Sequence, residues 1–148
     1  PDRFEPGTPN IPGILGLHAA LCDLEQTDMG KLHQHELELT QYFINGLMQM
    51  DPSESTLRAI GKHNTTERTS VVSVQTLQTD MARVAYELDN TYGIMTRVGL
   101  HCAPSAHKTL GTYPEGTIRF SFGPENTHHE VDLALHALAE ITGSPYHL

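Results

Sequence analysis

The sequence contains little of what marks several classes of protein. Its 148 residues include no tryptophan and two cysteines, and no apolar run approaches the ~20 residues that a helix needs to cross a bilayer. The first residues lack the charged and then apolar pattern of a targeting signal. Cys22 and Cys102 are too few and too different in their surroundings for a disulfide framework, which suits a reducing compartment. We therefore predict a cytoplasmic protein that does not span a membrane.

Basic residues are also scarce. Nine lysines and arginines stand against eighteen acidic residues, which gives a formal charge of −9. This balance disfavours nucleic acid and anionic membrane surfaces as partners, although one or two local arginines can still hold a small anion. With 38% apolar residues, a chain of this length can bury the core of one domain. It begins at Pro1 without a methionine, so we expect it to be a piece of a longer protein.

Apolar periodicity predicts four helices and four strands. The helices span 12–28, 31–50, 80–93 and 127–141, and the strands span 56–60, 70–77, 94–98 and 117–122. Gly30 is expected to separate the first two helices, and Thr127-His-His-Glu130 is a capping box that opens the last one. The order predicts an α+β fold, a small and mostly antiparallel sheet with helices packed on it. The apolar stripes of the helices, and Cys22, are predicted to lie in the core.

One segment, Arg97-Val-Gly-Leu-His-Cys-Ala-Pro104, sets a cysteine beside a histidine and a glycine where an apolar strand runs into a loop. A free thiol is only a few per cent ionised at neutral pH, and nearby cations raise the fraction of the reactive thiolate. Arg97 and His101 could supply that charge. Spacing alone leaves two interpretations of Cys102 open, a nucleophile or a turn cysteine that merely packs.

Five motifs in one order carry a family resemblance. They are Phe4-Glu-Pro-Gly-Thr-Pro-Asn10, Arg68-Thr-Ser-Val-Val-Ser73, Leu88-Asp89 with Gly93-Ile94, Arg97-Val-Gly-Leu-His-Cys-Ala103, and Gly116-Thr-Ile-Arg-Phe-Ser121 with Asn126-Thr127. Together they resemble the C-terminal part of cysteine desulfurases of the class V aminotransferase family, nearest the SUF-type branch. The resemblance implies that residues 1–148 form the small C-terminal domain of a fold type I pyridoxal-phosphate enzyme. Residues 1–11 would then be a loop between domains that reaches the cofactor, and the large cofactor domain is absent from this chain.

The resemblance also implies site residues. Cys102 matches the catalytic cysteine, whose thiolate attacks the sulfur of an L-cysteine held as a pyridoxal adduct, keeps the sulfur as a persulfide and leaves alanine. Arg119 matches the arginine that grips the substrate α-carboxylate, a task suited to a planar fork of N–H groups. Arg97 matches a family arginine near the cysteine and, with His101, is assigned to substrate binding.

The implied cofactor is pyridoxal 5′-phosphate, held mainly by the absent domain. Gly7 and Thr8 match a segment that in family dimers reaches the cofactor phosphate of the other subunit, so we expect a homodimer. Ser105-Ala-His-Lys108 imitates the pattern that carries the Schiff-base lysine, but the family lysine lies in the large domain, well before this segment. We therefore interpret Lys108 as a misleading match and expect the chain alone to be inactive.

The ten histidines do not indicate a metal site. Two sets could supply three ligands each, but neither has a recognised zinc spacing: His101, Cys102 and His107, and His128, His129 and His136. We expect no metal.

Two classes of function stay open. The first is a cysteine desulfurase, with L-cysteine as substrate and a sulfur-acceptor protein as a further partner; a selenocysteine lyase or another class V enzyme is a close variant. The second is a binding or dimerisation module without catalysis of its own. Cys102 favours the first class, because plain transamination needs no thiol.

Overall fold

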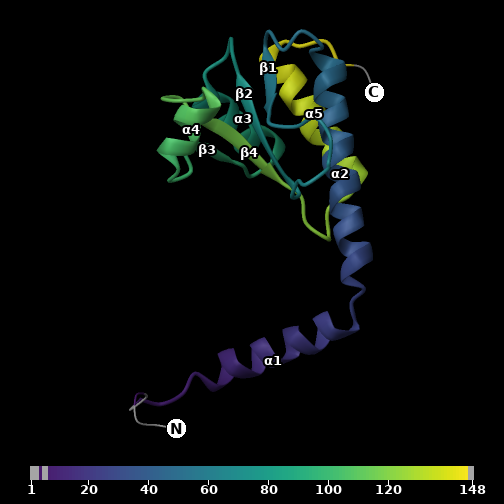
Figure 1. The fold of residues 1–148 in the computed structure, drawn as a ribbon, viewed down its shortest axis with the longest axis vertical. Helices are drawn as coiled ribbons and strands as arrows, with labels where there is room; N and C mark the ends of the chain where they lie inside the picture. The colour runs from purple at the N-terminus through teal and green to yellow at the C-terminus, as the bar shows by residue number, and fades with distance from the viewer. Residues whose placement is uncertain (1–3, 5–6, 147–148) are drawn as a thin grey trace. The chain divides into compact units, whose positions relative to one another are not determined.

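The computed structural model describes residue 4 and residues 7–146, so part of the loop predicted for residues 1–11 lies outside the described residues. The chain divides into two compact units, residues 1–33 and residues 34–148. Figure 1 labels their helices and strands. No helix in the described part of the chain is long and apolar enough to cross a membrane.

The first unit is built around helix α1 (Ile11–Gln26). Asn10 caps it, because its side-chain oxygen accepts a hydrogen bond of 3.1 Å from the Gly13 N–H. The prediction that the apolar stripe and Cys22 lie in the core was wrong, since α1 buries no residue. Five side chains of the stripe are 47% to 62% exposed: Ile14, Leu15, Leu17, Leu21 and Leu24. Periodicity identifies the apolar face of a helix, but it does not show whether the described chain supplies a partner for that face.

Helix α2 (Met29–Met50) begins one residue before Gly30, so the prediction that Gly30 separates two helices was wrong. The break falls at Thr27 and Asp28. The carboxylate of Asp28 accepts hydrogen bonds from the backbone N–H groups of Gly30 (3.1 Å) and Lys31 (3.2 Å). An aspartate that satisfies the free N–H groups of a first turn favours a helix start there, and one glycine does not outweigh it.

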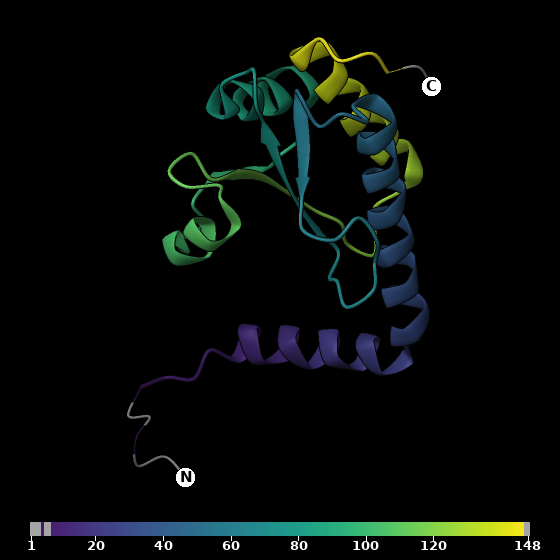
Figure 2. The ribbon, with the colours of Figure 1, turned by 45° about the horizontal axis from the view of Figure 1, so that its top comes forward.

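The second unit contains a four-stranded sheet in the order β1-β2-β4-β3, and every pair of strands is antiparallel. The strands are β1 (Leu57–Ile60), β2 (Val71–Thr76), β3 (Arg97–Gly99) and β4 (Thr117–Ser121). Helices α3 (Met81–Tyr92) and α5 (His128–Thr142) pack with α2 on this sheet (Figure 2). The predicted α+β fold is therefore confirmed, as is the mostly antiparallel sheet.

Two local predictions in the second unit were wrong. The strand predicted for 94–98 is β3, which begins only at Arg97, where pairing with β4 begins. The segment after Cys102, predicted as a loop, contains helix α4 (Pro104–Leu110). Pro104 opens α4 where its missing N–H costs no hydrogen bond, and Gly111 ends it with φ of 69°.

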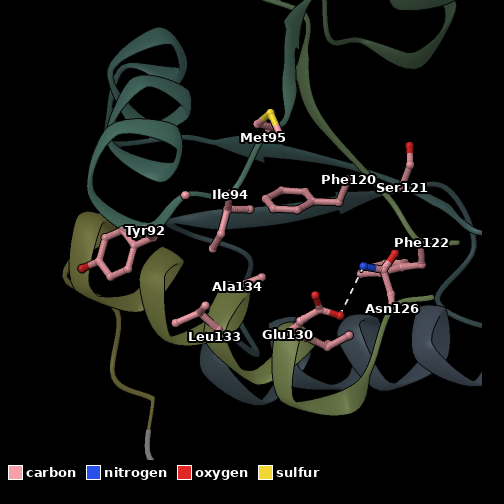
Figure 3. Close-up of a pocket in the computed structure, with 12 residues that line it drawn as sticks. Tyr92, Ile94, Met95, Phe120, Ser121, Phe122, Asn126, Glu130, Leu133 and Ala134 are labelled. Carbon is pink, nitrogen blue, oxygen red and sulfur yellow. Dashed lines mark hydrogen bonds between the residues drawn. The ribbon is translucent and has the colours of Figure 1, made fainter.

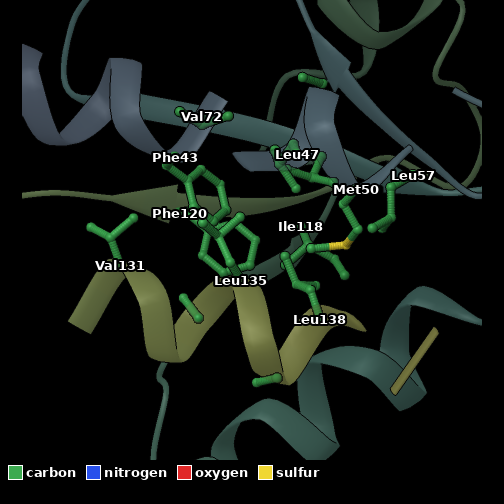
Figure 4. Close-up of a cluster of buried hydrophobic side chains, with 14 of the residues drawn as sticks. Phe43, Leu47, Met50, Leu57, Val72, Ile118, Phe120, Val131, Leu135 and Leu138 are labelled. Carbon is green, nitrogen blue, oxygen red and sulfur yellow. The ribbon is translucent and has the colours of Figure 1, made fainter. Parts of the chain in front are cut away.

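The sheet has an apolar face and a polar face. Val72 of β2 lies opposite Phe120 of β4, and both are buried beneath the helices (Figure 4). The ring of Phe43 on α2 lies 4.9 Å from that of Phe120, between centroids. Since neighbours along a strand point to opposite faces, Arg119 and its cross-strand neighbour Ser73 lie on the polar face. The core therefore occupies one side of the sheet, and the other side carries polar side chains such as Arg119.

Asp51 ties the end of α2 to the start of β1. Its buried carboxylate accepts hydrogen bonds from the backbone N–H groups of Thr56 (2.6 Å) and Leu57 (3.0 Å) and from the Ser53 hydroxyl (2.8 Å). Burial alone would raise the pKa of Asp51, but these hydrogen bonds outweigh burial and hold its pKa well below the usual range. The charged form is therefore the one that stabilises the fold.

We expect Asp51→Asn to lower the free energy of unfolding by about 2 kcal/mol, because charge-assisted hydrogen bonds are lost. The folded-state pKa lies below the unfolded value of about 3.9, so the stabilisation is complete above about pH 4 and is lost as the pH falls below it. Urea unfolding at several pH values measures both effects. Glu140→Gln, which changes an exposed carboxylate on α5, is the control; an equal loss in the two variants would contradict the role of Asp51.

Candidate functional site

Cys102 lies in a tight turn between β3 and α4. The Ala103 N–H donates to the Leu100 carbonyl over 2.8 Å, which closes the turn. Its two central residues, His101 and Cys102, have φ of 49° and 59°, in the left-handed region that residues with a Cβ rarely occupy. Such strain persists only where the surroundings impose it, and it is common at active sites. The Cys102 thiol is exposed and free.

Two glycines fix the approach to this turn. Gly99 ends β3 with φ of 107°, and Gly116 precedes β4 with φ of 84°. A Cβ on Gly116 would overlap the backbone carbonyl of Gly99, so a larger residue does not fit there without a shift of the backbone. The two backbones touch, and β3 and β4 therefore come together immediately before the turn that carries Cys102.

His101 holds the turn against β4. Its Nε2 lies 3.1 Å from the carbonyl oxygen and 3.2 Å from the hydroxyl oxygen of Thr117. A carbonyl only accepts, so Nε2 carries the proton and donates; Nδ1 is buried and has no hydrogen-bond partner among the described residues. Burial, and after it the charge of Arg119, lowers the pKa of His101. With its pKa below the ordinary value of about 6.5, the imidazole is mainly neutral at pH 7, which disfavours the positive charge that the sequence allowed His101 to supply.

Arg97 of β3 lies directly opposite Arg119 of β4, so both side chains leave the same face of the sheet. Like charges in this arrangement destabilise a sheet. Neither arginine forms an ion pair with a residue that the structure describes, and the buried Nε of Arg119 has no hydrogen-bond partner there. Both arginines contribute to the lowered pKa of His101, which places their charge near its ring. The pair is therefore suited to bind an anion such as a carboxylate.

Four of the predicted site residues thus come together, and we refer to them as the cysteine site: Arg97, His101, Cys102 and Arg119. Gly7 and Thr8 are exposed and belong to the other unit, residues 1–33. The Nζ of Lys108 lies over the ring of Tyr113, 5.1 Å from its centroid. Across the described residues, no group of three histidine, cysteine or acidic side chains is placed to hold a metal ion.

Sequence reasoning missed helix α4. A helix of seven residues is too short for its periodicity to be recognised, and its one buried residue, His107, is polar. The signal that could have found it is Pro104 followed seven residues later by Gly111, a proline at a helix start and a glycine at its end.

A separate pocket of about 330 Å³ lies between the end of α3, β4 and α5 (Figure 3). Ile94 and Phe120 contribute to its lining, and Glu130 is its charged member. The Glu130 carboxylate accepts the Thr127 N–H over 2.8 Å, and this bond lowers the pKa of Glu130. That carboxylate therefore caps α5, as the sequence predicted. The pocket contains none of the predicted site residues, and we place the candidate chemistry at the cysteine site.

Comparisons with known proteins agree with the family resemblance of the sequence. A family model described as "Aminotransferase class-V" matches residues 1–134. A protein of Pyrococcus abyssi named "Probable cysteine desulfurase" is 34% identical over 144 residues, which are 97% of this chain and 34% of that protein. The chain spans about a third of the length of the curated relatives it matches.

Solved structures with a similar fold are cysteine desulfurases as well. The apo cysteine desulfurase from Thermococcus onnurineus NA1 superimposes with a TM-score of 0.82 at 34% identity, over 97% of this chain and 34% of that one. The cysteine desulfurase CsdA from Escherichia coli superimposes with a TM-score of 0.70 at 26% identity, over 96% of this chain and 34% of that one.

We expect Gly116→Ala to lower the free energy of unfolding by about 2–5 kcal/mol, because the new methyl group overlaps the Gly99 backbone and alanine disfavours a positive φ. The matched control is Gly111→Ala, at φ of 69° with open space around it, which should cost only about 1–2 kcal/mol for the backbone conformation. Urea unfolding measures both. Equal costs would show that the two strands do not need this close contact.

Proposed function

The chain belongs to the class V aminotransferase family, and we propose that it supplies the thiol-bearing C-terminal domain of a cysteine desulfurase. The cysteine site carries this proposal. An exposed thiol lies in a strained turn that follows β3, and two arginines without an acidic partner in the described chain lie opposite each other on β3 and β4. Removal of sulfur from an amino acid needs both a nucleophile for the sulfur and a grip on the carboxylate. Relatives named as cysteine desulfurases match nearly the whole chain, which supports the same conclusion.

In this proposal the Cys102 thiolate takes the sulfur atom of L-cysteine. The C–S bond of the substrate breaks, an S–S bond forms at Cys102, and the products are an enzyme persulfide and alanine. The exposure of the thiol supports a second step, in which an acceptor thiol or a sulfur-acceptor protein removes the persulfide sulfur. A buried cysteine would allow neither reaction.

Arg119 is proposed to hold the substrate α-carboxylate, with Arg97 beside it. A guanidinium presents parallel N–H groups that match the two oxygens of a carboxylate, and the pair has no competing acid among the residues described. A bound carboxylate would also relieve the repulsion between the two arginines. His101, neutral and bonded to Thr117, then holds the turn in place and adds no further charge.

The class V aminotransferase family is generally dependent on pyridoxal phosphate. The described residues do not form a site for that cofactor by themselves, since the cysteine site offers no lysine and no aromatic ring to stack on a pyridine. Each of the three lysines has a partner: Lys31 with Asp28, Lys62 with Glu67, and Lys108 with Tyr113. We propose that the cofactor is held mainly by a larger domain outside this chain, and that Gly7 and Thr8 approach its phosphate in a homodimer.

We expect Cys102→Ser to abolish sulfur release from L-cysteine by the full-length enzyme and to leave its cofactor absorbance unchanged. The reason is that the nucleophile belongs to this chain and the cofactor belongs to the domain proposed outside it. Sulfide and alanine are measured in the presence of a reducing thiol. Cys22→Ser removes the other thiol of the chain and is the control, with activity retained. Full activity of the Cys102 variant would overturn the assignment, and an inactive wild type would favour a non-catalytic module.

We expect Arg119→Ala to raise the KM for L-cysteine roughly ten- to a hundredfold, because a charge-assisted pair with a carboxylate is worth about 1.5–3 kcal/mol. Arg119→Lys should recover part of this loss, since lysine keeps the charge but not the fork. Steady-state kinetics measures both variants. Arg83→Ala on α3 breaks an exposed ion pair with Glu87 and serves as the control. An unchanged KM in Arg119→Ala would mean that the carboxylate is held elsewhere.

A further inference from the structure

Helix α4 is attached to the fold through a single buried side chain. Of its seven residues only His107 is buried, at 6% exposed. The Nδ1 atom of His107 lies 2.6 Å from the hydroxyl oxygen of Thr112, which is itself 1% exposed. A short hydrogen bond between two buried groups fixes α4 to the segment that leads into β4.

The contacts of His107 reach the turn that carries Cys102. The His107 N–H donates to the Ala103 carbonyl over 3.2 Å, and Ala103 is the residue that closes the turn. The ring centroids of His107 and His101 lie 5.8 Å apart, and the two ring planes are tilted by 43°. His107 therefore contacts the turn both through its backbone and through its ring.

Thr112 connects the same histidine to β4. Its carbonyl accepts the Gly116 N–H over 2.7 Å, and the next residue, Thr117, accepts the hydrogen bond of His101. The contacts thus link the turn to α4 through His107, α4 to β4 through Thr112, and β4 back to the turn through His101.

The turn requires such support on both sides. Two consecutive residues with a Cβ and a positive φ relax to other conformations unless their neighbours prevent it. The side toward β3 is held by Gly99 and by the bond of His101 to Thr117. On the side toward α4, His107 supplies the one buried side chain of the helix, since its other residues are exposed.

We propose that His107, through its bond to Thr112, is a positioning residue that sets the conformation of the Cys102 turn for sulfur transfer. This inference rests on the proposed function for its kinetic consequence. The arginines that would hold the substrate lie opposite each other on β3 and β4, and neither lies on α4. Loss of the His107 bond should therefore slow the transfer of sulfur and leave substrate binding intact.

The test uses two matched variants. His107→Asn places an amide near the position of Nδ1 and keeps a side-chain partner for the Thr112 hydroxyl. His107→Gln places its amide near the position of Nε2 and leaves that hydroxyl only its longer bond, of 3.4 Å, to the backbone carbonyl of residue 107. A second pair gives the same comparison from the other side, since Thr112→Ser keeps the hydroxyl and Thr112→Val removes it. This second pair decides the question if His107→Gln does not fold.

Hydrogen exchange on the 148-residue chain tests the structural part without any enzyme activity. In His107→Gln and Thr112→Val, the amides of Ala103, His107 and Thr112 should exchange at least tenfold faster, while those of β2 and α5 stay unchanged. His107→Asn and Thr112→Ser should resemble the wild type. Uniformly faster exchange over the whole unit, or no change at the turn, would overturn the positioning role.

Kinetics of the full-length enzyme tests the functional part. We expect kcat for sulfur transfer to fall at least tenfold in His107→Gln, with the KM for L-cysteine within twofold of the wild type, and His107→Asn to restore most of kcat. A rise in KM with kcat unchanged, or equal losses in both variants, would overturn the inference. If the wild type does not release sulfur, the proposed function fails, and hydrogen exchange still decides whether His107 controls the turn.

Discussion

The contact between the backbones of Gly99 and Gly116 is the constraint on which the rest of the site depends. It brings β3 against β4 in one register, and that register puts Arg97 opposite Arg119. A slip of one residue would send one arginine to the apolar face of the sheet. The same contact also determines where β3 ends, and the turn that carries Cys102 follows directly after it. A strand of three residues can orient a site in this way only because its end is held so closely.

The site combines two features that cost stability, a strained turn and a pair of like charges. Stabilising contacts elsewhere in the unit offset them, among them the Asp51 carboxylate with its backbone donors and the ring of Phe43 in the core. The neutral state of His101 avoids a further cost in stability. A third cation near the two arginines would add repulsion, whereas a neutral imidazole donates to Thr117 and only supports the turn.

The features that could be predicted from the sequence are those with local signals. The capping box at Thr127 gave the start of α5, and the alternation along β4 gave a strand with Arg119 on its polar face. Helix α4 gave no periodic signal, because seven residues cover less than two turns and the one buried residue is His107; Pro104 and Gly111 were the only local signals of its ends. The exposure of α1 could not be predicted either, since an apolar stripe has the same sequence pattern whether or not a partner covers it. The pairing of Arg97 with Arg119 depends on a register between separate strands, which composition does not encode.

The two arginines belong to a chain whose formal charge is −9. A long polyanion, which extends over many times the screening distance of about 8 Å, meets the acidic surface of the chain as well as the arginines and is repelled. A compact carboxylate fits within that distance of Arg97 and Arg119 and experiences a field that is locally positive. We therefore expect the cysteine site to favour small anions over long polyanions such as nucleic acid.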